Sequence, residues 1–388
     1  MRLAIVNLTG GGFSGGYRKY LKNMLPRLAE HNDVKALLCI SPEGNDIASW
    51  FNKPSAIQFC SCRHLQINHL VHIPDKKMAE CLIDFSPDII FMPVDRYIKF
   101  KNVPVVNMVR NMEPLVPNMK GDSWGEIFKK FIQRKLTCNS VRLATHTIAV
   151  SGFVKDYLTT KLHISENKIS LVYHGLTPPL NCIRPATIPD GWDDNFLFTS
   201  GSIRPARGID DALEAMFYLK QQHDLKLVIA GETVPNMKKY RAGLEKFVVL
   251  KGLANNVCWA GNLNEEEMHW CYEKCRLFIM TSRIEACPNI AMEAMSTGSI
   301  AIAANNPPLP EFFSNCAVYY EPKSGRSLAE AIIQRMSIDG KQRLAMSKQA
   351  KMKSSMFSWD LTADKTVSVL MRVLELSKLR FPCQAPCK

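Results

Sequence analysis

Two glutamates stand eight positions apart in the segment Glu285-Ala-Cys-Pro-Asn-Ile-Ala-Met-Glu293. A strand-like apolar run, Leu277 to Met280, comes just before them, and Pro288 suits the first turn of a helix. A helix start offers free N–H groups and the positive end of the dipole, which together bind phosphate. A carboxylate accepts paired hydrogen bonds from vicinal hydroxyls. The segment therefore predicts a site where one glutamate holds a ribose diol and the other holds sugar hydroxyls, although two ordinary surface glutamates would show the same spacing.

A second segment, Gly201-Ser-Ile-Arg204-Pro-Ala-Arg207-Gly208, places two arginines between a predicted strand, Phe196–Ser200, and a predicted helix, Ile209–Gln221. Guanidinium groups at such a turn can stabilise the charge that develops on a departing phosphate. Arginines in turns are also often solvated, with their stems lying along apolar surface. Either interpretation fits the spacing alone.

Taken together, these two segments resemble the donor half of the family 4 retaining glycosyltransferases, which have the GT-B fold. The resemblance extends to Leu227–Gly231, Ile148–Val154 and Ile169–Leu176, and it is closest over residues 146–321. It implies an α/β protein of two Rossmann-like domains, whose parallel sheets face each other across a cleft. It also implies sugar transfer from a nucleotide-sugar without a metal.

The resemblance implies roles for individual residues. Glu285 would touch the transferred sugar, Glu293 the nucleotide ribose, and the arginine pair the departing phosphate. Backbone N–H groups of Cys287 to Ile290 would cradle the phosphates or the sugar. The further donor-binding candidates are Ser202, Cys287, Pro288, Asn289, Ile290, Gly231 and His174. For His174, however, a structural role that bridges the domains is favoured over contact with the donor.

The chain departs from the family pattern at several of these positions. Family members usually carry Arg where this chain has Ser202, and Lys where it has Arg207, so we expect Arg204 to compensate. Gly-Phe or Gly-Leu usually follows the first glutamate, whereas Ala286 and Cys287 stand here. The shape of the sugar pocket is therefore expected to differ.

A glycine-rich segment, Gly10-Gly-Gly12-Phe-Ser-Gly15-Gly16, follows the first predicted strand and precedes a predicted helix, Tyr17–Glu30. It fits G-x-G-x-x-G literally, but the second predicted strand ends without the acid that a dinucleotide site requires. The resemblance implies a flexible loop in which Gly12, Gly15 and Gly16 line the acceptor side of the cleft. A glycine turn that only reverses the chain is the alternative.

Many family members place a histidine after the fifth strand of the first domain, near the reacting sugar. This chain has Val109-Arg110-Asn111-Met-Glu113 there. We expect Arg110 and Asn111 to orient the sugar or a phosphate, and Glu113 could assist the acceptor, although a plain loop fits equally well.

Short β-branched runs alternate with longer helical patterns along the whole chain, which is typical of parallel βαβ units. The predicted strands are Leu3–Asn7, Val34–Ile40, Ala56–Phe59, Ile89–Met92, Val103–Met108, Thr147–Val150, Phe196–Ser200, Leu225–Ala230, Val257–Trp259, Leu277–Met280 and Ser299–Ala303. The Pro-rich passage Thr177–Gly191 is the expected linker. We therefore expect one domain at residues 1–175 and another at 176–358. A final helix and tail at 359–388 should pack back on the N-terminal domain.

A net charge of +13 predicts an anionic partner, such as a phosphorylated substrate or a membrane surface. Nucleic acid is not expected, because the basic residues are dispersed and carry no recognition motif. No stretch approaches the ~18 apolar residues of a membrane span, so we expect a cytoplasmic protein. The apolar residues Trp124, Phe128 and Phe131 recur at helical spacing among lysines and arginines. They could form a peripheral face on the inner membrane, or pack on their own domain.

The thirteen cysteines are scattered through apolar segments, and we expect free thiols rather than disulfides. The residues Cys60, Cys62, His64, His69 and His72 could each ligate a metal, but their spacing fits no standard zinc pattern. We expect no metal and no cofactor.

The sequence as a whole predicts a retaining glycosyltransferase that moves a sugar from a nucleotide-sugar to a glycan or lipid-linked acceptor. Synthesis of a cell-surface polysaccharide or glycoconjugate is the expected setting. A non-catalytic nucleotide-sugar-binding protein and a sugar-nucleotide epimerase, both with the GT-B fold, are the alternatives. The base, the sugar and the acceptor are not encoded in any motif we recognise.

Overall fold

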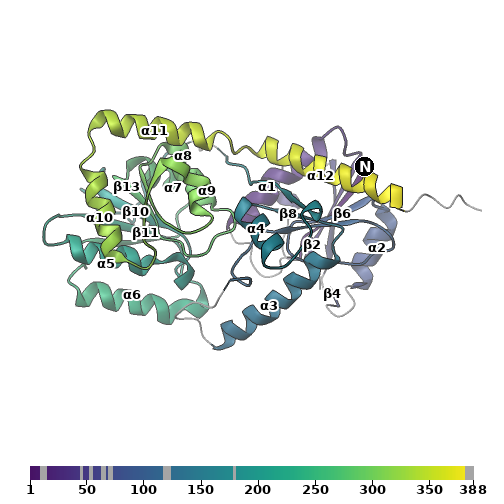
Figure 1. Cartoon of the computed structure of the whole chain (residues 1–388), viewed down its shortest axis with the longest axis horizontal. Coiled ribbons are helices and arrows are strands. Elements are labelled where there is room, and N and C mark those ends of the chain that lie inside the picture. Colours follow the sequence, from purple (N-terminus) through teal and green to yellow (C-terminus); the bar gives the residue numbers. More distant parts are fainter. Residues whose placement is uncertain are drawn as a thin grey trace, which may run out of the picture. The chain divides into compact units, whose positions relative to one another are not determined.

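The chain folds into two compact units, each built on its own sheet (Figure 1). The structure is a computed structural model that describes residues 1–8, 15–43, 47–51, 56–62, 67–68, 73–116, 124–177 and 181–380. The first unit comprises 1–115, 128–175 and 358–388, and the second comprises 116–127 and 176–357. The chain thus leaves the first unit and returns to it at the end.

The first unit contains a seven-stranded parallel sheet in the order β3-β2-β1-β6-β7-β8-β9. Its strands are β1 (Arg2–Val6), β2 (Ala36–Pro42), β3 (Ile57–Cys62), β6 (Ile89–Met92), β7 (Val105–Val109), β8 (His146–Ala149) and β9 (Ile169–Leu171). Every residue of β6, β7 and β8 is buried, which explains why these strands are continuous apolar runs without alternation. A short antiparallel pair, β4 (Ile67–Asn68) and β5 (Ile73–Pro74), accompanies the sheet.

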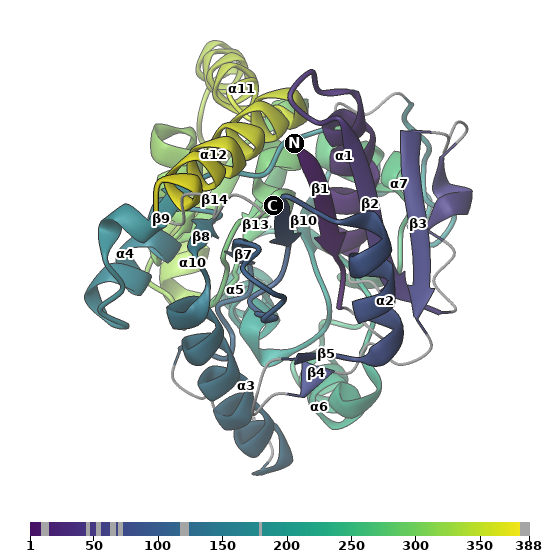
Figure 2. The ribbon, with the colours of Figure 1, turned by 90° about the vertical axis from the view of Figure 1, so that its right-hand side faces the viewer.

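The helices of the first unit include α1 (Gly15–Glu30), α2 (Lys76–Phe85), α4 (Gly152–Thr160) and most of α3 (Trp124–Leu143). Figure 2 shows β1, β2 and β3 side by side, with α2 beside them. The α2 helix begins where the Asp75 carboxylate accepts a hydrogen bond from the Met78 N–H at 2.8 Å. It ends at Ser86, whose left-handed conformation closes the helix.

The final helix, α12 (Trp359–Arg380), belongs to the first unit and packs beside α1. Trp359 is buried and makes an edge contact with Tyr20 of α1, at 5.8 Å between ring centroids. An ion pair of 2.6 Å between Arg27 and Asp360 joins the same two helices at the surface. Aromatic packing inside and a charge pair outside therefore anchor the end of the chain.

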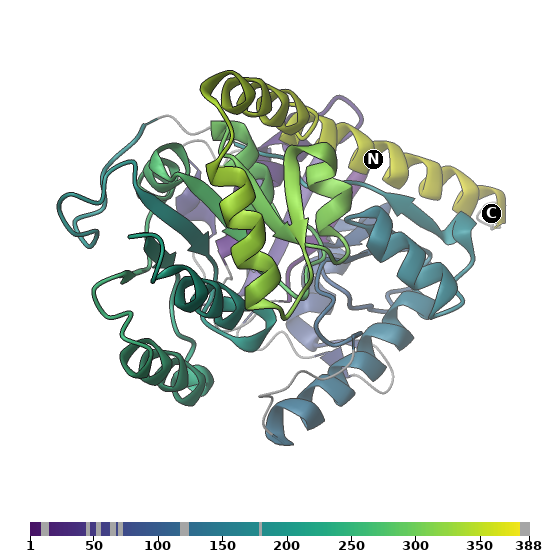
Figure 3. The same cartoon turned by 60° about the vertical axis from the view of Figure 1, so that its left-hand side comes forward.

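The second unit contains a six-stranded parallel sheet in the order β12-β11-β10-β13-β14-β15. Figure 3 turns the green ribbon of this unit towards the viewer. Its strands are β10 (Phe196–Ser200), β11 (Lys226–Ala230), β12 (Val257–Gly261), β13 (Leu277–Met280), β14 (Ala301–Ala304) and β15 (Ala317–Tyr320). Its helices are α5 (Ile209–Leu219), α6 (Lys238–Leu250), α7 (Glu265–Lys274), α8 (Asn289–Thr297), α9 (Leu309–Phe313), α10 (Gly325–Met336) and α11 (Gly340–Ser354). The α/β class and the two parallel sheets predicted from the sequence are confirmed.

All the predicted strands overlap observed ones, but the sequence missed β4, β5, β9 and β15. β9 and β15 are short strands at the edges of the two large sheets, and β4 and β5 form a separate two-stranded sheet. Edge strands bury less, so their apolar pattern is weaker. The predicted N-terminal helix starts at Gly15 rather than at Tyr17, and Gly15 and Gly16 therefore belong to the first turn of α1 instead of a loop.

Among the helices that the structure describes, none combines the length and apolar content that crossing a bilayer requires.

The expectation of free thiols is wrong for one pair, because Cys60 of β3 and Cys81 of α2 form a disulfide. The two residues lie 21 positions apart, and the packing of α2 against β3 brings them together. Cys62 lies close by, with its sulfur 4.0 Å from that of Cys60. The histidines of the predicted cluster, His64, His69 and His72, lie outside the described residues.

Candidate functional site

The candidate site lies in the second unit, where the central strands β10 and β13 end. The arginine-bearing segment follows β10, forms a short 3-10 turn at Pro205–Arg207 and leads into α5. Two of its backbone carbonyls accept hydrogen bonds from residues at the end of β13 and in the loop that follows. The Thr281 hydroxyl donates to the Arg207 carbonyl at 2.6 Å, and the Arg283 N–H donates to the Ala206 carbonyl at 2.8 Å. Ligands of open parallel sheets bind at this edge.

Arg207 and Glu285, which the sequence placed at one site, form an ion pair. The Arg207 Nη1 atom donates to Glu285 Oε1, and also to the Ser282 hydroxyl at 3.2 Å. The side chains are only 21% and 11% exposed, so the pair is shielded enough for its charges to interact strongly. The arginine and the first glutamate therefore act as one preorganised group.

Arg204 and Ser202 lie on the same segment and are both half-buried. Arg204 precedes the 3-10 turn, and its carbonyl accepts the Arg207 N–H at 2.9 Å. Its backbone therefore helps to shape the turn that presents Arg207.

The glycine that ends the 3-10 turn is required by sterics. Gly208 has φ +62, and a Cβ there would lie 2.3 Å from the Thr281 carbonyl oxygen. A side chain would push the two loops apart, so glycine permits the close approach that places Arg207 beside Glu285.

A charged network that the sequence analysis missed supports the same turn. Arg283 donates to Asp210 at 2.6 Å and to Asp211 at 2.5 Å, and its Nη1 atom donates to the Pro205 carbonyl at 3.3 Å. Asp211 is 2% exposed and accepts a further hydrogen bond from the Tyr320 hydroxyl at 2.9 Å. Burial raises the pKa of Asp211, and the charge of Arg283 opposes that rise. The sequence feature that could have indicated this network is the pair Asp210 and Asp211, which follows Gly208 at the start of a predicted helix.

The second glutamate, Glu293, is half-buried on α8 and contacts a buried tyrosine. The Tyr272 hydroxyl donates to Glu293 Oε2 at 3.3 Å and lies 3.4 Å from the Ser200 hydroxyl at the end of β10. Burial raises the pKa of Tyr272, so its hydroxyl stays protonated and remains a donor. Tyr272 thus orients the carboxylate, a role that the sequence analysis did not assign.

Fewer backbone N–H groups between Cys287 and Ile290 are available to a ligand than the sequence predicted. Pro288 precedes the helix and has no N–H, and the Asn289 N–H donates to the Cys287 carbonyl at 3.0 Å. Pro288 therefore cannot serve as a backbone donor, and the Asn289 N–H is already engaged. The predicted cradle is thereby reduced to the N–H groups of Cys287 and Ile290.

Gly231 lies at the end of β11, next to the start of the basic segment. The Ile203 N–H donates to the Glu232 carbonyl at 2.8 Å, and the Gly201 N–H donates to the Ala230 carbonyl at 3.0 Å. A Cβ on Gly231 would lie 2.0 Å from the Gly201 carbonyl oxygen, and its φ is +133. Gly231 therefore fixes the distance between two strand ends of the site.

The candidates of the first unit form a separate group. Arg110 follows β7, its Nε atom donates to the Pro93 carbonyl at 3.1 Å, and its guanidinium carbon lies 3.7 Å from the centre of the Tyr17 ring. Asn111 is exposed, and its side-chain oxygen accepts the Glu113 N–H at 3.0 Å, which closes a local turn. Gly12 lies outside the described residues.

His174 does not lie at an open site. It is 6% exposed, and its ring packs between Tyr20, at 5.1 Å, and Trp359, at 6.0 Å, within the first unit. This burial favours the structural interpretation, and we withdraw His174 from the donor-binding candidates.

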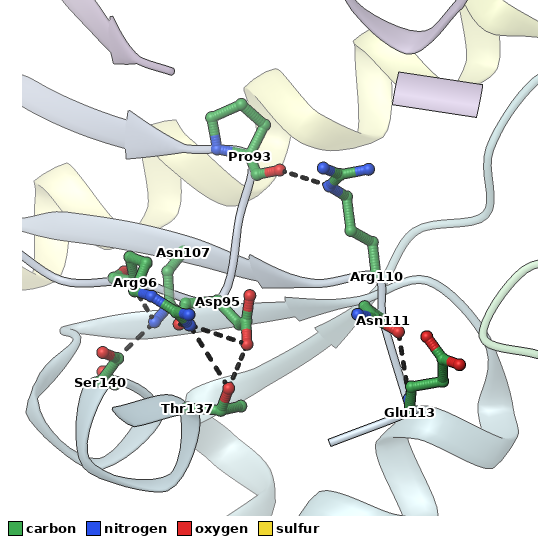
Figure 4. Close-up of polar contacts among 9 residues, drawn as sticks. All are labelled: Pro93, Asp95, Arg96, Asn107, Arg110, Asn111, Glu113, Thr137 and Ser140. Carbon is green, nitrogen blue, oxygen red and sulfur yellow. Dashed lines mark hydrogen bonds and ion pairs between the residues drawn. The ribbon is translucent and has the colours of Figure 1, made fainter. Parts of the chain in front are cut away.

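Figure 4 shows a polar cluster beside Arg110 that the sequence analysis did not mention. Asp95, three residues after β6, accepts hydrogen bonds from the Thr137 hydroxyl and from Arg96, the latter at 3.1 Å. The Asn107 side chain donates to the carbonyls of Arg96 and Ser140, both at 3.2 Å. The cluster ties the loop after β6 to α3 and fixes the backbone that carries Pro93.

Known proteins resemble the chain in both sequence and structure. Residues 189–353 match the family model described as Glycosyl transferases group 1. The chain is 24% identical over 242 residues to the uncharacterized glycosyltransferase MJ1607 of Methanocaldococcus jannaschii, a match that covers 59% of this chain and 60% of that protein. It is 23% identical over 337 residues to the O-antigen chain mannosyltransferase RfbU of Salmonella typhimurium, covering 84% and 89% of the two chains. The structure of Anabaena Alr3699/HepE in complex with UDP and glucose has a TM-score of 0.73 at 16% identity, covering 96% of this chain and 99% of that one.

The two parallel sheets and the likeness to solved glycosyltransferase structures define an α/β protein with the GT-B fold. The matched domain and the mannosyltransferase relatives show that the chain is a glycosyltransferase. They do not assign roles to residues, which rest on the geometry above.

Proposed function

We propose that this glycosyltransferase binds a nucleotide-sugar in its second unit and transfers the sugar with retention of anomeric configuration, as a member of family 4. The observation that carries the proposal is the shielded pair of Arg207 and Glu285 at the carboxyl ends of β10 and β13. A cation for a phosphate and an acceptor for hydroxyls are the two groups that a nucleotide-sugar requires, and here they are in contact.

Each charged residue has a specific role in this proposal. Glu285 accepts hydrogen bonds from hydroxyls of the sugar, and Glu293, oriented by Tyr272, accepts them from the ribose diol. Arg207 binds the phosphate that leaves with the nucleotide, and Arg204 adds positive charge on the same segment. Because Nη1 of Arg207 is bonded to Glu285 and Ser282, its other terminal nitrogen can face the phosphate.

The transfer step follows from these positions. The bond between the anomeric carbon and the phosphate oxygen breaks, and the acceptor hydroxyl oxygen bonds to the same face of that carbon. The proton of the acceptor hydroxyl passes to the departing phosphate. Arg207 stabilises the charge that accumulates on the phosphate, an interaction that is stronger in the transition state than in the ground state. Neither metal nor cofactor takes part in the proposed step, so chelators should leave turnover unchanged.

We propose a glycan or a lipid-linked saccharide as the acceptor, in synthesis of a surface polysaccharide. The resemblance to RfbU, named as an O-antigen chain mannosyltransferase, supports this setting and makes nucleotide-activated mannose the first donor to try. UDP-glucose is the second, because the Anabaena protein of similar fold is solved with UDP and glucose.

We also propose that α3 contacts the anionic inner face of a membrane. Its apolar residues Trp124, Phe128 and Phe131 are 87%, 65% and 53% exposed, so more than half of each residue's surface is uncovered. Lysine and arginine residues flank them, and the Lys135 ammonium lies 4.6 Å from the Phe131 ring centre. An exposed apolar stripe edged with basic groups suits a surface of anionic lipid.

Flotation with phosphatidylglycerol vesicles tests the membrane contact. Replacing Phe128 and Phe131 together by Ser should abolish binding at low salt, whereas Leu344→Ser, at an equally exposed position of α11, should not. Equal flotation of all three proteins would remove α3 from the proposal.

Nucleotide release tests the catalytic proposal. The full chain is incubated with each sugar nucleotide and a panel of saccharide acceptors, with and without EDTA, and the product anomer is read by NMR. We expect acceptor-dependent release of nucleotide and an unchanged anomeric configuration. Binding without release would favour the non-catalytic alternative, and a changed sugar on the nucleotide would favour an epimerase.

A further inference from the structure

Arg110 lies at the carboxyl end of the first sheet, directly after β7. Its guanidinium lies against the face of the Tyr17 ring, and its Nε atom donates to the Pro93 carbonyl at 3.1 Å. The Tyr17 ring is itself fixed, because its hydroxyl donates to the Asn7 side chain at 2.7 Å. The charged group is therefore held in one position before any ligand arrives.

Within the described part of the chain Arg110 forms no direct ion pair with a carboxylate, although the charge of Asp95 partly opposes the lowering of its pKa by burial. The nearby acid, Asp95, already accepts hydrogen bonds from Thr137 and from Arg96. Burial lowers the pKa of Arg110, which means that the charged form is poorly solvated there. Arg110 is half-buried, and shielded charges in proteins are normally paired, so its position favours binding of an anion.

A second arginine of the same unit shows the contrast. Arg2 also stacks on a ring, that of Phe85 at 4.6 Å, but at the opposite end of the sheet. Its Nε and Nη2 atoms both donate to the Phe85 carbonyl, at 3.0 and 2.6 Å. Among the described residues Arg110 donates one hydrogen bond, from Nε, and Figure 4 shows no dashed line at either terminal nitrogen.

We propose that Arg110 binds a phosphate group of a substrate in the first unit. The two terminal nitrogens of a guanidinium can donate parallel hydrogen bonds to two oxygens of one phosphate. The negative charge of that phosphate would balance the positive charge of Arg110. This proposal rests on the proposed function, because both substrates of the proposed transfer reaction carry phosphate groups. The nucleotide-sugar carries a diphosphate, and a lipid-linked saccharide carries phosphate at its link.

The first test measures anion binding without catalysis. Inorganic pyrophosphate is titrated by calorimetry into the full-length protein and its Arg110→Met, Arg207→Met and Arg2→Met variants. The Arg207 variant removes the cation of the second unit, and Arg2→Met is the matched control for losing a stacked arginine. We expect Arg207→Met to retain a pyrophosphate site that disappears when Arg110→Met is added. The proposal would be overturned if Arg207→Met alone abolished pyrophosphate binding and Arg110→Met left pyrophosphate binding unchanged.

The second test identifies the source of the phosphate. If the donor supplies it, Arg110→Met weakens binding of GDP or UDP by roughly tenfold, equivalent to about 1.4 kcal/mol. If the acceptor supplies it, nucleotide affinity is unchanged, and KM rises by roughly tenfold for a diphosphate-linked saccharide but not for its neutral alkyl glycoside. Arg110→Lys should recover part of either loss, because it keeps the charge without the fork.

Unchanged nucleotide affinity together with unchanged KM for both acceptors would refute the assignment of Arg110. A wrong assignment of the donor site in the second unit would give a different result. In that case variants of Glu285 and Glu293 would behave as wild type, while pyrophosphate binding through Arg110 would persist.

Discussion

Replacing Gly231 by alanine should destabilise the second unit and disturb the donor site together. The residue has φ +133, a conformation that costs a non-glycine residue about 1–3 kcal/mol. The added Cβ would also lie 2.0 Å from the Gly201 carbonyl oxygen, which is backbone and cannot turn away. Relieving such an overlap costs about 1–3 kcal/mol more, so we expect a total loss of about 2–6 kcal/mol.

Gly261 provides the matched control. It ends the neighbouring strand β12, and its carbonyl accepts the Gly231 N–H at 2.7 Å. Its φ is +73, but an added Cβ would meet no heavy atom of the described residues within 4 Å, so alanine there should cost only the backbone term of about 1–2 kcal/mol. Urea unfolding of both variants measures the difference, and nucleotide calorimetry shows whether Gly231→Ala also loses affinity. Equal losses of stability, with nucleotide affinity intact in both, would refute the close-approach argument.

Substitutions at four further residues test separate parts of the structure. Arg207→Met should lower turnover by about a hundredfold and Arg207→Lys should recover part of it, whereas unchanged turnover of Arg204→Met would exclude Arg204 from the phosphate site. Arg283→Met should lower the free energy of unfolding by about 3 kcal/mol, because it leaves Asp211 buried without its cation; a loss below about 1 kcal/mol in urea unfolding would contradict this. Burial lowers the pKa of His146 to about 4, from an ordinary value of about 6.5, so the folded state keeps this side chain neutral. Stability should therefore be complete above pH 6.5 and fall by at most about 3 kcal/mol as the pH drops towards 4, a loss that thermal melts of His146→Gln should not show.

Much of the fold could be predicted from the sequence, because strands buried on both faces are unbroken apolar runs. Ile89–Met92 and Leu277–Met280 are examples, and each is a central strand in the structure. The missed strand β15 lies at a sheet edge, where a half-buried run such as Ala317–Tyr320 looks like loop. The disulfide of Cys60 was also missed, since the packing of a helix on a strand decides which cysteines meet.

The candidate site was predictable only in part. Residues that follow strand ends, such as Arg207 and Glu285, could be found because parallel strands bring their carboxyl ends to one edge. Tyr272 could not, because it lies on a helix and reaches Glu293 through tertiary packing alone. His174 lies just before the chain enters the second unit, as its position suggested, and aromatic rings from two helices enclose it, which agrees with the structural role.

The central claim is that Glu285 holds the sugar and Glu293 the nucleotide ribose of one donor. Calorimetry of the free nucleotide and of the matching nucleotide-sugar, on Glu285→Ala, Glu293→Ala and the exposed control Glu245→Ala, tests it most directly. The account predicts that Glu293→Ala weakens both ligands by roughly tenfold, while Glu285→Ala weakens only the nucleotide-sugar and the control neither. Wild-type affinity for both ligands in both site variants would contradict it.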